Sequence, residues 1–217
     1  MSRFLIAALA IFSWSVVSDA PQYLFDKESQ IAAGAQAFAQ TCYSCHSMKY
    51  MRTDAVSLSG GIQPDQAPQW TEDSWNGHPP PDLSLITAAK GVDYVYSYLM
   101  GYYVDETHPS GFENIVMPGT QMPNPFAAMQ GEQELVLTDP EVRLFQALKL
   151  KNRGAKSPQE FEDYVSSIAV YLEYASDPSQ AYREHIGYYV LGFLAVMIVI
   201  MIALDLAYWK DIHGDHQ

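Results

Sequence analysis

Apolar side chains recur at helical spacing in two stretches of the chain. In the first, steps of four, three and four residues predict one face of a helix that carries Ile31, Ala35, Phe38 and Cys42. The second stretch begins with the capping box Ser157-Pro158-Gln159-Glu160 and ends at Asp177-Pro178. Its apolar positions form one broad helix face: Phe161, Tyr164, Val165, Ile168, Tyr171, Leu172 and Ala175. We expect this face to pack across the first helix, where Gly34 either permits a close approach or is incidental.

Between these helices the pattern predicts shorter elements. Residues 52–81 contain paired glycines and several prolines, which are typical of an irregular segment. Two short helices are expected after it, one over 82–90 stopped by Gly91 and one over 93–100 stopped by Gly101.

The secondary structure of residues 132–150 is ambiguous. Thr138-Asp139-Pro140-Glu141 either starts a helix, with Pro140 in its first turn, or turns a hairpin. We favour the hairpin, with strands over 135–137 and 144–150.

The two ends of the chain carry the longest apolar runs. Residues 1–20 contain Arg3, an apolar run and then small residues, which is typical of a secretory signal peptide; a retained anchor is the alternative. A second run without charge extends from Tyr188 to Leu204, flanked by aromatic residues, and predicts a transmembrane helix. The expected organisation is a signal peptide over 1–20, an exported body over 21–183, an anchor over 184–209 and a cytoplasmic tail over 210–217.

The charge balance excludes one class of partner. The net charge is −13 and the isoelectric point is about 4.6, whereas a nucleic-acid-binding protein needs a basic face. We therefore expect no nucleic acid among the partners.

The chemistry of the chain is concentrated in Cys42-Tyr43-Ser44-Cys45-His46. Two cysteines three apart with a histidine directly after them are what covalent haem attachment requires, and the chain contains no other cysteine. A thioredoxin-like site would follow a strand, and a zinc site needs about four ligands, so both fit less well. An accidental pairing of buried thiols is the third alternative. Trp70 and Trp75 are expected to cover an apolar surface, for which a haem edge is the natural candidate.

His46 would supply one axial ligand to the iron, with its other ring nitrogen held by a carbonyl or a carboxylate. A methionine on the opposite side would close the coordination sphere and raise the potential. Of the nine methionines, Met117 and Met122 lie in a proline-stiffened loop that suits a redox ligand. The residues alone do not decide between these two.

Several blocks together resemble the cytochrome c1 family, the haem subunit of the quinol–cytochrome c reductase (cytochrome bc1) complex. They are Gly34-Ala35-Gln36, the haem motif, Tyr50-Met51-Arg52, Pro80-Pro81-Asp82-Leu83-Ser84, Asp93-Tyr94-Val95-Tyr96, Met122-Pro123, Tyr174 to Arg183, and Tyr208-Trp209-Lys210-Asp211. The resemblance implies a mainly α fold, a class I cytochrome c-like haem domain with long loop insertions plus one C-terminal transmembrane helix. It also implies that Met122 rather than Met117 is the sixth ligand, beside Cys42, Cys45 and His46.

The resemblance further implies a function and a set of partners. The chain would carry one covalent haem c in the periplasm, on a single-pass inner-membrane anchor. It would accept an electron from the Rieske iron–sulfur protein and pass it to a cytochrome c, within a dimeric complex that contains cytochrome b. Four acidic residues are candidates for docking a cationic cytochrome c: Glu132, Glu134, Asp139 and Glu141. The alternative is a membrane-anchored monohaem cytochrome that serves a terminal oxidase or acts as a tethered shuttle.

Overall fold

The computed structural model describes residues 27–136 and 144–214, which fall into two compact units. One unit contains residues 28–92 and 166–214 and is called the motif unit below, because the Cys-x-x-Cys-His sequence lies in it. The other contains the described residues from 93 to 165 and is called the hairpin unit. The predicted signal peptide and residues 138–141 lie outside the described residues.

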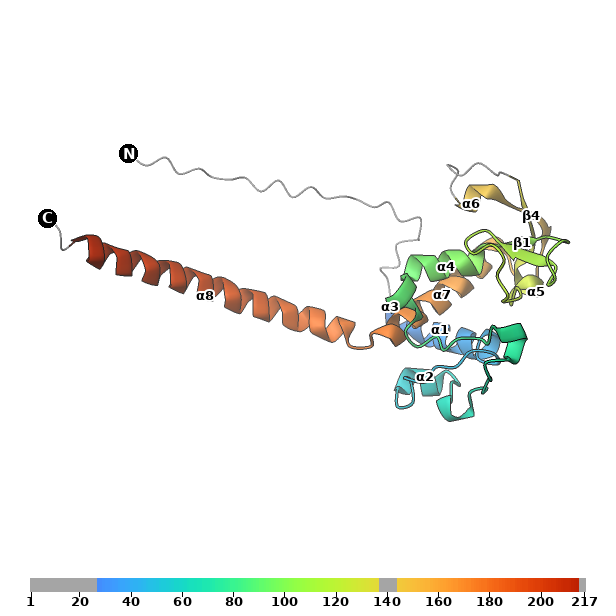
Figure 1. Ribbon diagram of the computed structural model, residues 1–217, viewed down its shortest axis with the longest axis horizontal. Coiled ribbons are helices and arrows are strands. Elements are labelled where there is room, and N and C mark those ends of the chain that lie inside the picture. Colours follow the sequence, from blue (N-terminus) through green and yellow to red (C-terminus); the bar gives the residue numbers. More distant parts are fainter. Residues whose placement is uncertain (1–26, 137–143, 215–217) are drawn as a thin grey trace. The chain divides into compact units, whose positions relative to one another are not determined.

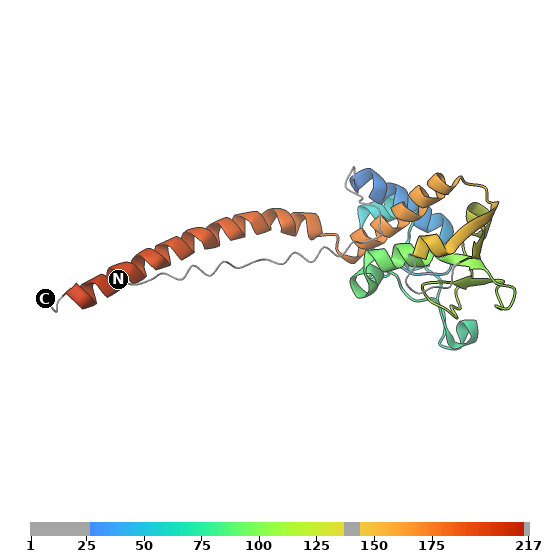
Figure 2. The same cartoon turned by 90° about the horizontal axis from the view of Figure 1, so that it is seen from above.

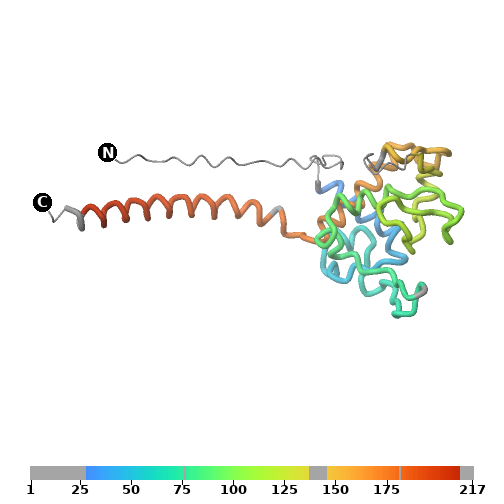
Figure 3. The backbone as a smooth tube through the Cα atoms, turned by 45° about the horizontal axis from the view of Figure 1, so that its top comes forward, coloured from blue at the N-terminus to red at the C-terminus, as the bar shows by residue number. Residues whose placement is uncertain are grey.

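Helices build the motif unit. They are α1 (Lys27–Thr41), α2 (Ala55–Ser59), α3 (Ile86–Lys90), the C-terminal part of α7 (Pro158–Ser176) and α8 (Gln180–Gly214) (Figure 1). Two short 3₁₀ turns, Pro64–Gln66 and Ser74–Gly77, interrupt a backbone that Figure 3 shows as mostly loops between α2 and α3. The prediction of an entirely irregular segment over 52–81 was therefore wrong at α2 and at these two turns.

The predicted packing of the two long helices is confirmed within the motif unit. All four apolar positions of the first stripe are buried. The ring of Phe38 on α1 lies 5.6 Å from that of Tyr171 on α7. A Cβ built on Gly34 would lie 2.0 Å from the carbonyl oxygen of Ser167, so the backbones of α1 and α7 are in direct contact there. Gly34 is thus the residue that permits the close approach.

Side-chain hydrogen bonds attach α2 and α3 to α7. Asp54 caps α2 by accepting from the Ser57 N–H at 2.7 Å, and it also accepts from the Tyr174 hydroxyl at 2.5 Å. The hydroxyl of Thr87 on α3 donates to the carbonyl oxygen of Leu172 at 3.0 Å. Because α1, α2 and α3 all contact α7, this helix is the central element of the motif unit.

The hairpin unit combines short helices with two antiparallel hairpins. Its elements are α4 (Val92–Met100), β1 (Tyr102–Val104), β2 (Phe112–Asn114), α5 (Ala127–Gln130), β3 (Gly131–Leu135), α6 (Leu144–Ala147), β4 (Leu148–Arg153) and the start of α7. β1 pairs with β2 and β3 pairs with β4, the second pair having an irregularity between Glu132 and Gln133. The mainly helical fold class is confirmed.

The predictions for the short elements differ in their outcome. The helix over 93–100 is confirmed as α4, and α3 in the motif unit stops before Gly91 as expected although it begins later than predicted. A hairpin does form in the ambiguous region, but its first strand is β3, and residues 144–147 are helical. The capping box of α7 is confirmed: Ser157 N–H donates to Glu160 Oε2 at 2.8 Å, and Glu160 N–H donates to Ser157 Oγ at 3.3 Å.

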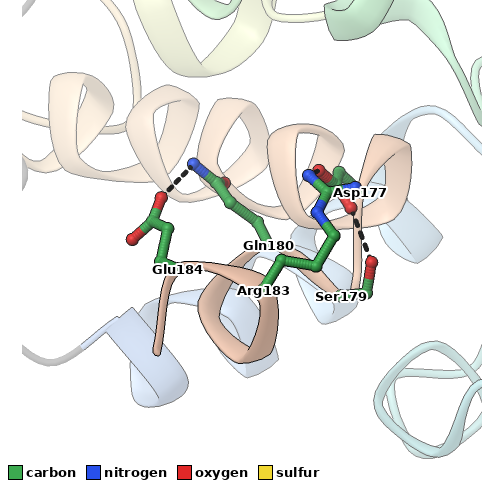
Figure 4. A network of polar contacts seen from close by, with 5 residues as sticks. All are labelled: Asp177, Ser179, Gln180, Arg183 and Glu184. Carbon is green, nitrogen blue, oxygen red and sulfur yellow. Dashed lines mark hydrogen bonds and ion pairs between the residues drawn. The ribbon is translucent and has the colours of Figure 1, made fainter. Parts of the chain in front are cut away.

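A three-residue joint connects α7 to α8. Figure 4 shows Asp177 accepting from both Ser179 and Arg183, and Gln180 bonding Glu184 within the first turn of α8. Because the Arg183 side chain is 63% exposed, this ion pair contributes only about 0–1 kcal/mol. The joint is only three residues long and includes Pro178. These two features restrict its backbone conformation more than the ion pair does.

The helix α8 is unbroken in both ribbon views (Figures 1 and 2). It contains Tyr182–Lys210, a stretch long and apolar enough to cross a membrane. At about 1.5 Å per residue, this stretch exceeds the roughly 30 Å of a hydrocarbon layer. Trp209 Nε1–H donates to Asp205 Oδ1 at 3.1 Å near its end, which satisfies two polar groups on one helix face.

Replacing Gly34 with alanine is expected to destabilise the protein. Alanine favours a helix by about 1 kcal/mol over glycine, whereas overpacking costs about 1–3 kcal/mol. The clash is with the Ser167 carbonyl, which no side-chain rotation relieves, so we expect the cost to lie at the upper end of this range and the net loss to approach about 2 kcal/mol. Chemical denaturation of the full chain in detergent, followed by circular dichroism, measures it. The control Gln36→Ala, at an exposed position of α1, should change the free energy of unfolding little; an equal effect of both substitutions would contradict the packing argument.

Candidate functional site

The Cys-x-x-Cys-His sequence forms one helical turn that continues α1. Cys42 N–H donates to the carbonyl oxygen of Phe38 at 2.8 Å, and His46 N–H donates to that of Cys42 at 2.9 Å. Cys42 therefore prolongs the apolar stripe of α1, and His46 follows one turn later. Both residues are buried, at 6% and 7% exposure. The structure thus brings Cys42, Cys45 and His46 together at the end of the helix that packs on α7.

The two thiols are free and differ in their surroundings. Burial, with a smaller contribution from the neighbouring Cys45, raises the pKa of Cys42 to about 12. The Cys42 thiol is therefore protonated at neutral pH and is a poor partner for disulfide exchange. Cys45 is only partly buried.

The imidazole of His46 is held in one orientation. Its Nδ1 lies 2.8 Å from the carbonyl oxygen of Pro81, which only accepts, so Nδ1 carries the proton and the lone pair is on Nε2. The expected carbonyl partner is thereby confirmed. Burial lowers the pKa of His46 despite the opposing effects of this hydrogen bond and of Asp82, which favours the neutral ring that binds a metal.

Hydrogen bonds to the carboxylate of Asp82 connect the segment around Pro81 to the residues that follow His46. Its Oδ2 accepts from Ser47 Oγ at 2.7 Å and from Lys49 N–H at 2.8 Å, and its Oδ1 accepts from Ser84 N–H at 3.1 Å. Partial burial alone would raise the pKa of Asp82, but these hydrogen bonds outweigh it and the pKa is lowered. No role for the Asp82 carboxylate was predicted from the sequence. The available signal was an aspartate two residues before a serine, directly after three prolines, which predicts a turn stabilised by the carboxylate.

Two tryptophans lie at the motif. Trp70 Nε1–H donates to the carbonyl oxygen of Cys45 at 2.8 Å. The ring of Trp75 packs against that of Trp70 edge-on, with centroids 5.7 Å apart, and each side chain is 40% exposed. Their expected role in covering a haem edge stays a prediction.

The two candidate methionines belong to the hairpin unit. Met117 is 49% exposed, whereas Met122 is half-buried and lies between the buried residues Thr120 and Phe126. The hydroxyl of Tyr102 donates to the carbonyl oxygen of Met122 at 3.2 Å. This contact was not predicted from the sequence.

The residues of the motif unit fit a covalently attached haem. They provide two unpaired thiols on one helical turn and an imidazole with its metal-binding nitrogen available. Across the described ranges, no group of three or more His, Cys, Asp or Glu side chains is arranged to hold a metal ion by itself. A zinc-type site is therefore not built in the part of the chain that the structure describes.

Comparisons with known proteins agree with this chemistry. The Cytochrome C1 family matches residues 62–212. Cytochrome c1 of Allochromatium vinosum is 34% identical over 86% of this chain and 86% of its own length. The ammonia monooxygenase gamma subunit of Nitrosomonas europaea is 29% identical over 98% of this chain and 99% of its own. Cytochrome c1 of Rhodospirillum rubrum is 25% identical over 85% of this chain and 82% of its own.

Asp82→Asn is expected to loosen the segment that holds His46. In either orientation the new amide group faces a backbone N–H donor, so the variant should lose about 1–2 kcal/mol in free energy of unfolding at neutral pH. The folded pKa of Asp82 is depressed, so its stabilisation is present above the ordinary value of 3.8 and is lost as the pH falls through the lower folded value. The difference between wild type and variant should therefore shrink towards pH 3.

The exposed Asp73 offers a matched control for this measurement, because its side chain makes no cap hydrogen bond. Asp73→Asn should leave the free energy of unfolding nearly unchanged at neutral pH. A pH-independent difference for Asp82→Asn, or an equal one for Asp73→Asn, would show that the carboxylate does not anchor the segment.

Proposed function

The chain belongs to the cytochrome c1 family, and on this premise we propose that it takes an electron from a Rieske iron–sulfur protein and passes it to a cytochrome c. It is a haem c electron-transfer subunit, and its cofactor is haem c. The finer proposal is that it works within a dimeric quinol–cytochrome c reductase beside cytochrome b. The observation that supports it most is the combination of the family match with a Cys-x-x-Cys-His turn whose imidazole is oriented by a backbone carbonyl.

Four residues would hold the haem. Cys42 and Cys45 would form the thioether links, His46 would bind the iron through Nε2, and Met122 would supply the opposite ligand. The haem, when bound, carries one electron by alternating between its ferric and ferrous states. The protein contributes the orientation of the ring of His46, the exclusion of water from Cys42 and His46, and the restraint of the loop that carries Met122.

Met122 is preferred to Met117 for one reason in addition to the resemblance. The backbone of each residue is held, Met122 by Tyr102 and Met117 by Asn114, so the difference lies in the exposure of the side chains. Met117 exposes about half of its side chain, which is unfavourable for a thioether in a site that excludes water.

The membrane topology follows from the same proposal. Residues 184–209 of α8 would anchor the protein, with the body over 21–183 in the periplasm after removal of residues 1–20 and residues 210–217 in the cytoplasm.

Among the acidic docking candidates, Glu134 is paired across the β3–β4 ladder with Lys149, which offsets its charge. Glu132 is exposed and is the better candidate of the two within the described residues.

Purification of the tagged full chain from its native membranes tests the proposed complex. We expect cytochrome b and a Rieske protein to co-purify, with quinol–cytochrome c reductase activity and both b-type and c-type signals in the reduced-minus-oxidised spectrum. The Cys42→Ala chain is the control, because loss of one thioether should weaken or abolish covalent haem attachment. Isolation alone, with a terminal oxidase, or with an ammonia monooxygenase would contradict the proposal.

A pair of substitutions tests the methionine. Met122→Leu should leave the haem attached and lower its midpoint potential on the order of 100 mV, because a thioether raises the potential and axial ligands set it over a range of ~0.8 V. The matched variant Met117→Leu should leave the potential unchanged. Redox titration of the two full-length proteins measures both, and the reverse result would move the ligand to Met117.

A further inference from the structure

The loop that carries both candidate methionines is held by side chains from α4, β1 and β2. This segment, residues 115–126, is called the methionine loop below. At its start, Asn114 is fully buried; its Oδ1 accepts from Val116 N–H at 2.9 Å and from Met117 N–H at 3.2 Å. The amide of Asn114 in turn donates to the carbonyl oxygen of Tyr98 at 2.7 Å. The first turn of the loop is therefore attached to the end of α4.

A second attachment runs through three hydroxyl groups. Thr120 Oγ1 lies 2.7 Å from the hydroxyl of Tyr98, and that hydroxyl lies 2.9 Å from the hydroxyl of Tyr102. The Tyr102 hydroxyl is also 3.2 Å from the carbonyl oxygen of Met122. Tyr102 is the donor in both contacts, so its one hydrogen is shared between the hydroxyl of Tyr98 and the carbonyl of Met122. Tyr98 accepts from Tyr102 and has its own hydrogen for Thr120, so the three hydroxyl groups and this carbonyl form one connected network.

Burial protects these hydrogen bonds from competition by water. Tyr102 is 1% exposed and Thr120 is 2% exposed, so neither hydroxyl has water as a substitute partner. The phenol rings of Tyr98 and Tyr102 also contact each other edge-on, with centroids 5.6 Å apart. Burial raises the pKa of Tyr102 above its usual value, so the phenol keeps its proton and stays a donor at neutral pH.

We propose that Tyr102 is a positioning residue for the sulfur ligand, held in place by Tyr98 and Thr120. The inference depends on the proposed assignment of Met122 as the sixth ligand. A thioether is released from iron when the residue that carries it moves away. If that movement displaces the backbone at position 122, it breaks the hydrogen bond from Tyr102. The bond therefore stabilises the state in which the methionine stays in place against any competing ligand.

Competition by imidazole measures this stabilisation directly. In the ferric, haem-loaded full chain in detergent, added imidazole displaces a methionine and removes the long-wavelength sulfur-to-iron absorption band. Tyr102→Phe should bind imidazole about fivefold more tightly than wild type, the factor expected for the loss of one intramolecular hydrogen bond. Thr120→Val keeps the shape of the side chain and should shift the affinity in the same direction by a smaller factor.

Tyr103→Phe is the matched control. Tyr103 is the next residue of β1, on the opposite face of the strand, so its phenol points away from this chain of hydroxyl groups. A purely structural effect of losing a phenol from β1 would appear in both variants, whereas a positioning role predicts the change for Tyr102→Phe alone. Equal imidazole affinities for the two variants and wild type would overturn the inference. If Tyr102→Phe does not retain haem, an unchanged affinity in Thr120→Val overturns it.

Met122→Leu tests the assignment of Met122 as the iron ligand separately from the positioning role of Tyr102. If the sulfur-to-iron band is lost in Met122→Leu but Tyr102→Phe behaves as the control does, the ligand assignment stands and only the positioning role fails. If the band survives in Met122→Leu, the assignment of Met122 fails, and the role of Tyr102 fails with it.

Discussion

One hydrogen bond, from Nδ1 of His46 to the carbonyl oxygen of Pro81, sets the chemistry of the motif unit. It places the proton on one ring nitrogen and leaves the other for a metal, and burial acts in the same direction by disfavouring the charged ring. The acceptor belongs to the last of three consecutive prolines, whose fixed φ angles present the carbonyl at little entropic cost. Asp82, directly after it, then bonds three groups on either side of the contact. The orientation of one imidazole therefore depends on a stiff segment of backbone 35 residues further along the chain.

The position of the motif depends on the packing of α1. The apolar stripe of this helix continues without a break into Cys42, so burial of Phe38 against Tyr171 also carries the first cysteine into the interior. Gly34 sets how closely α1 approaches α7, because only a hydrogen fits beside the Ser167 carbonyl. The same residues that form the core thus determine where the thiols and the imidazole lie. A substitution that changes the packing of α1 on α7 should therefore also move the motif.

The periodicity of apolar residues and the local capping signals were sufficient to predict the long helices, but they did not predict the shortest elements. The stripe of α1, the face of α7, its capping box and the glycine stops after α3 and α4 are all local signals, and each is confirmed. The helix α2 has five residues and depends on Asp54, which also bonds Tyr174 120 residues later; a pairing over that distance leaves no local pattern. Strands of three residues, such as β1 and β2, are likewise too short for alternation to register. For the site, the motif and the turn at Asp82 are visible in the sequence, whereas the contact of Pro81 with His46 and that of Tyr102 with Met122 are created only by the fold.

The way the two candidate iron ligands are held distinguishes electron transfer from chemistry on a bound molecule. An iron that activates a substrate needs a coordination position that opens, whereas an electron carrier needs ligands that hardly move when the charge on the metal changes. His46 is held through its ring nitrogen, and Met122 is held through its backbone carbonyl. Each hydrogen bond contributes only about 1 kcal/mol on its own, but each is attached to further bonds, at Asp82 in one unit and at Tyr98 and Thr120 in the other. Restraint of this kind within each unit suits a ligand that hardly moves when the charge on the metal changes, which is what an electron carrier requires.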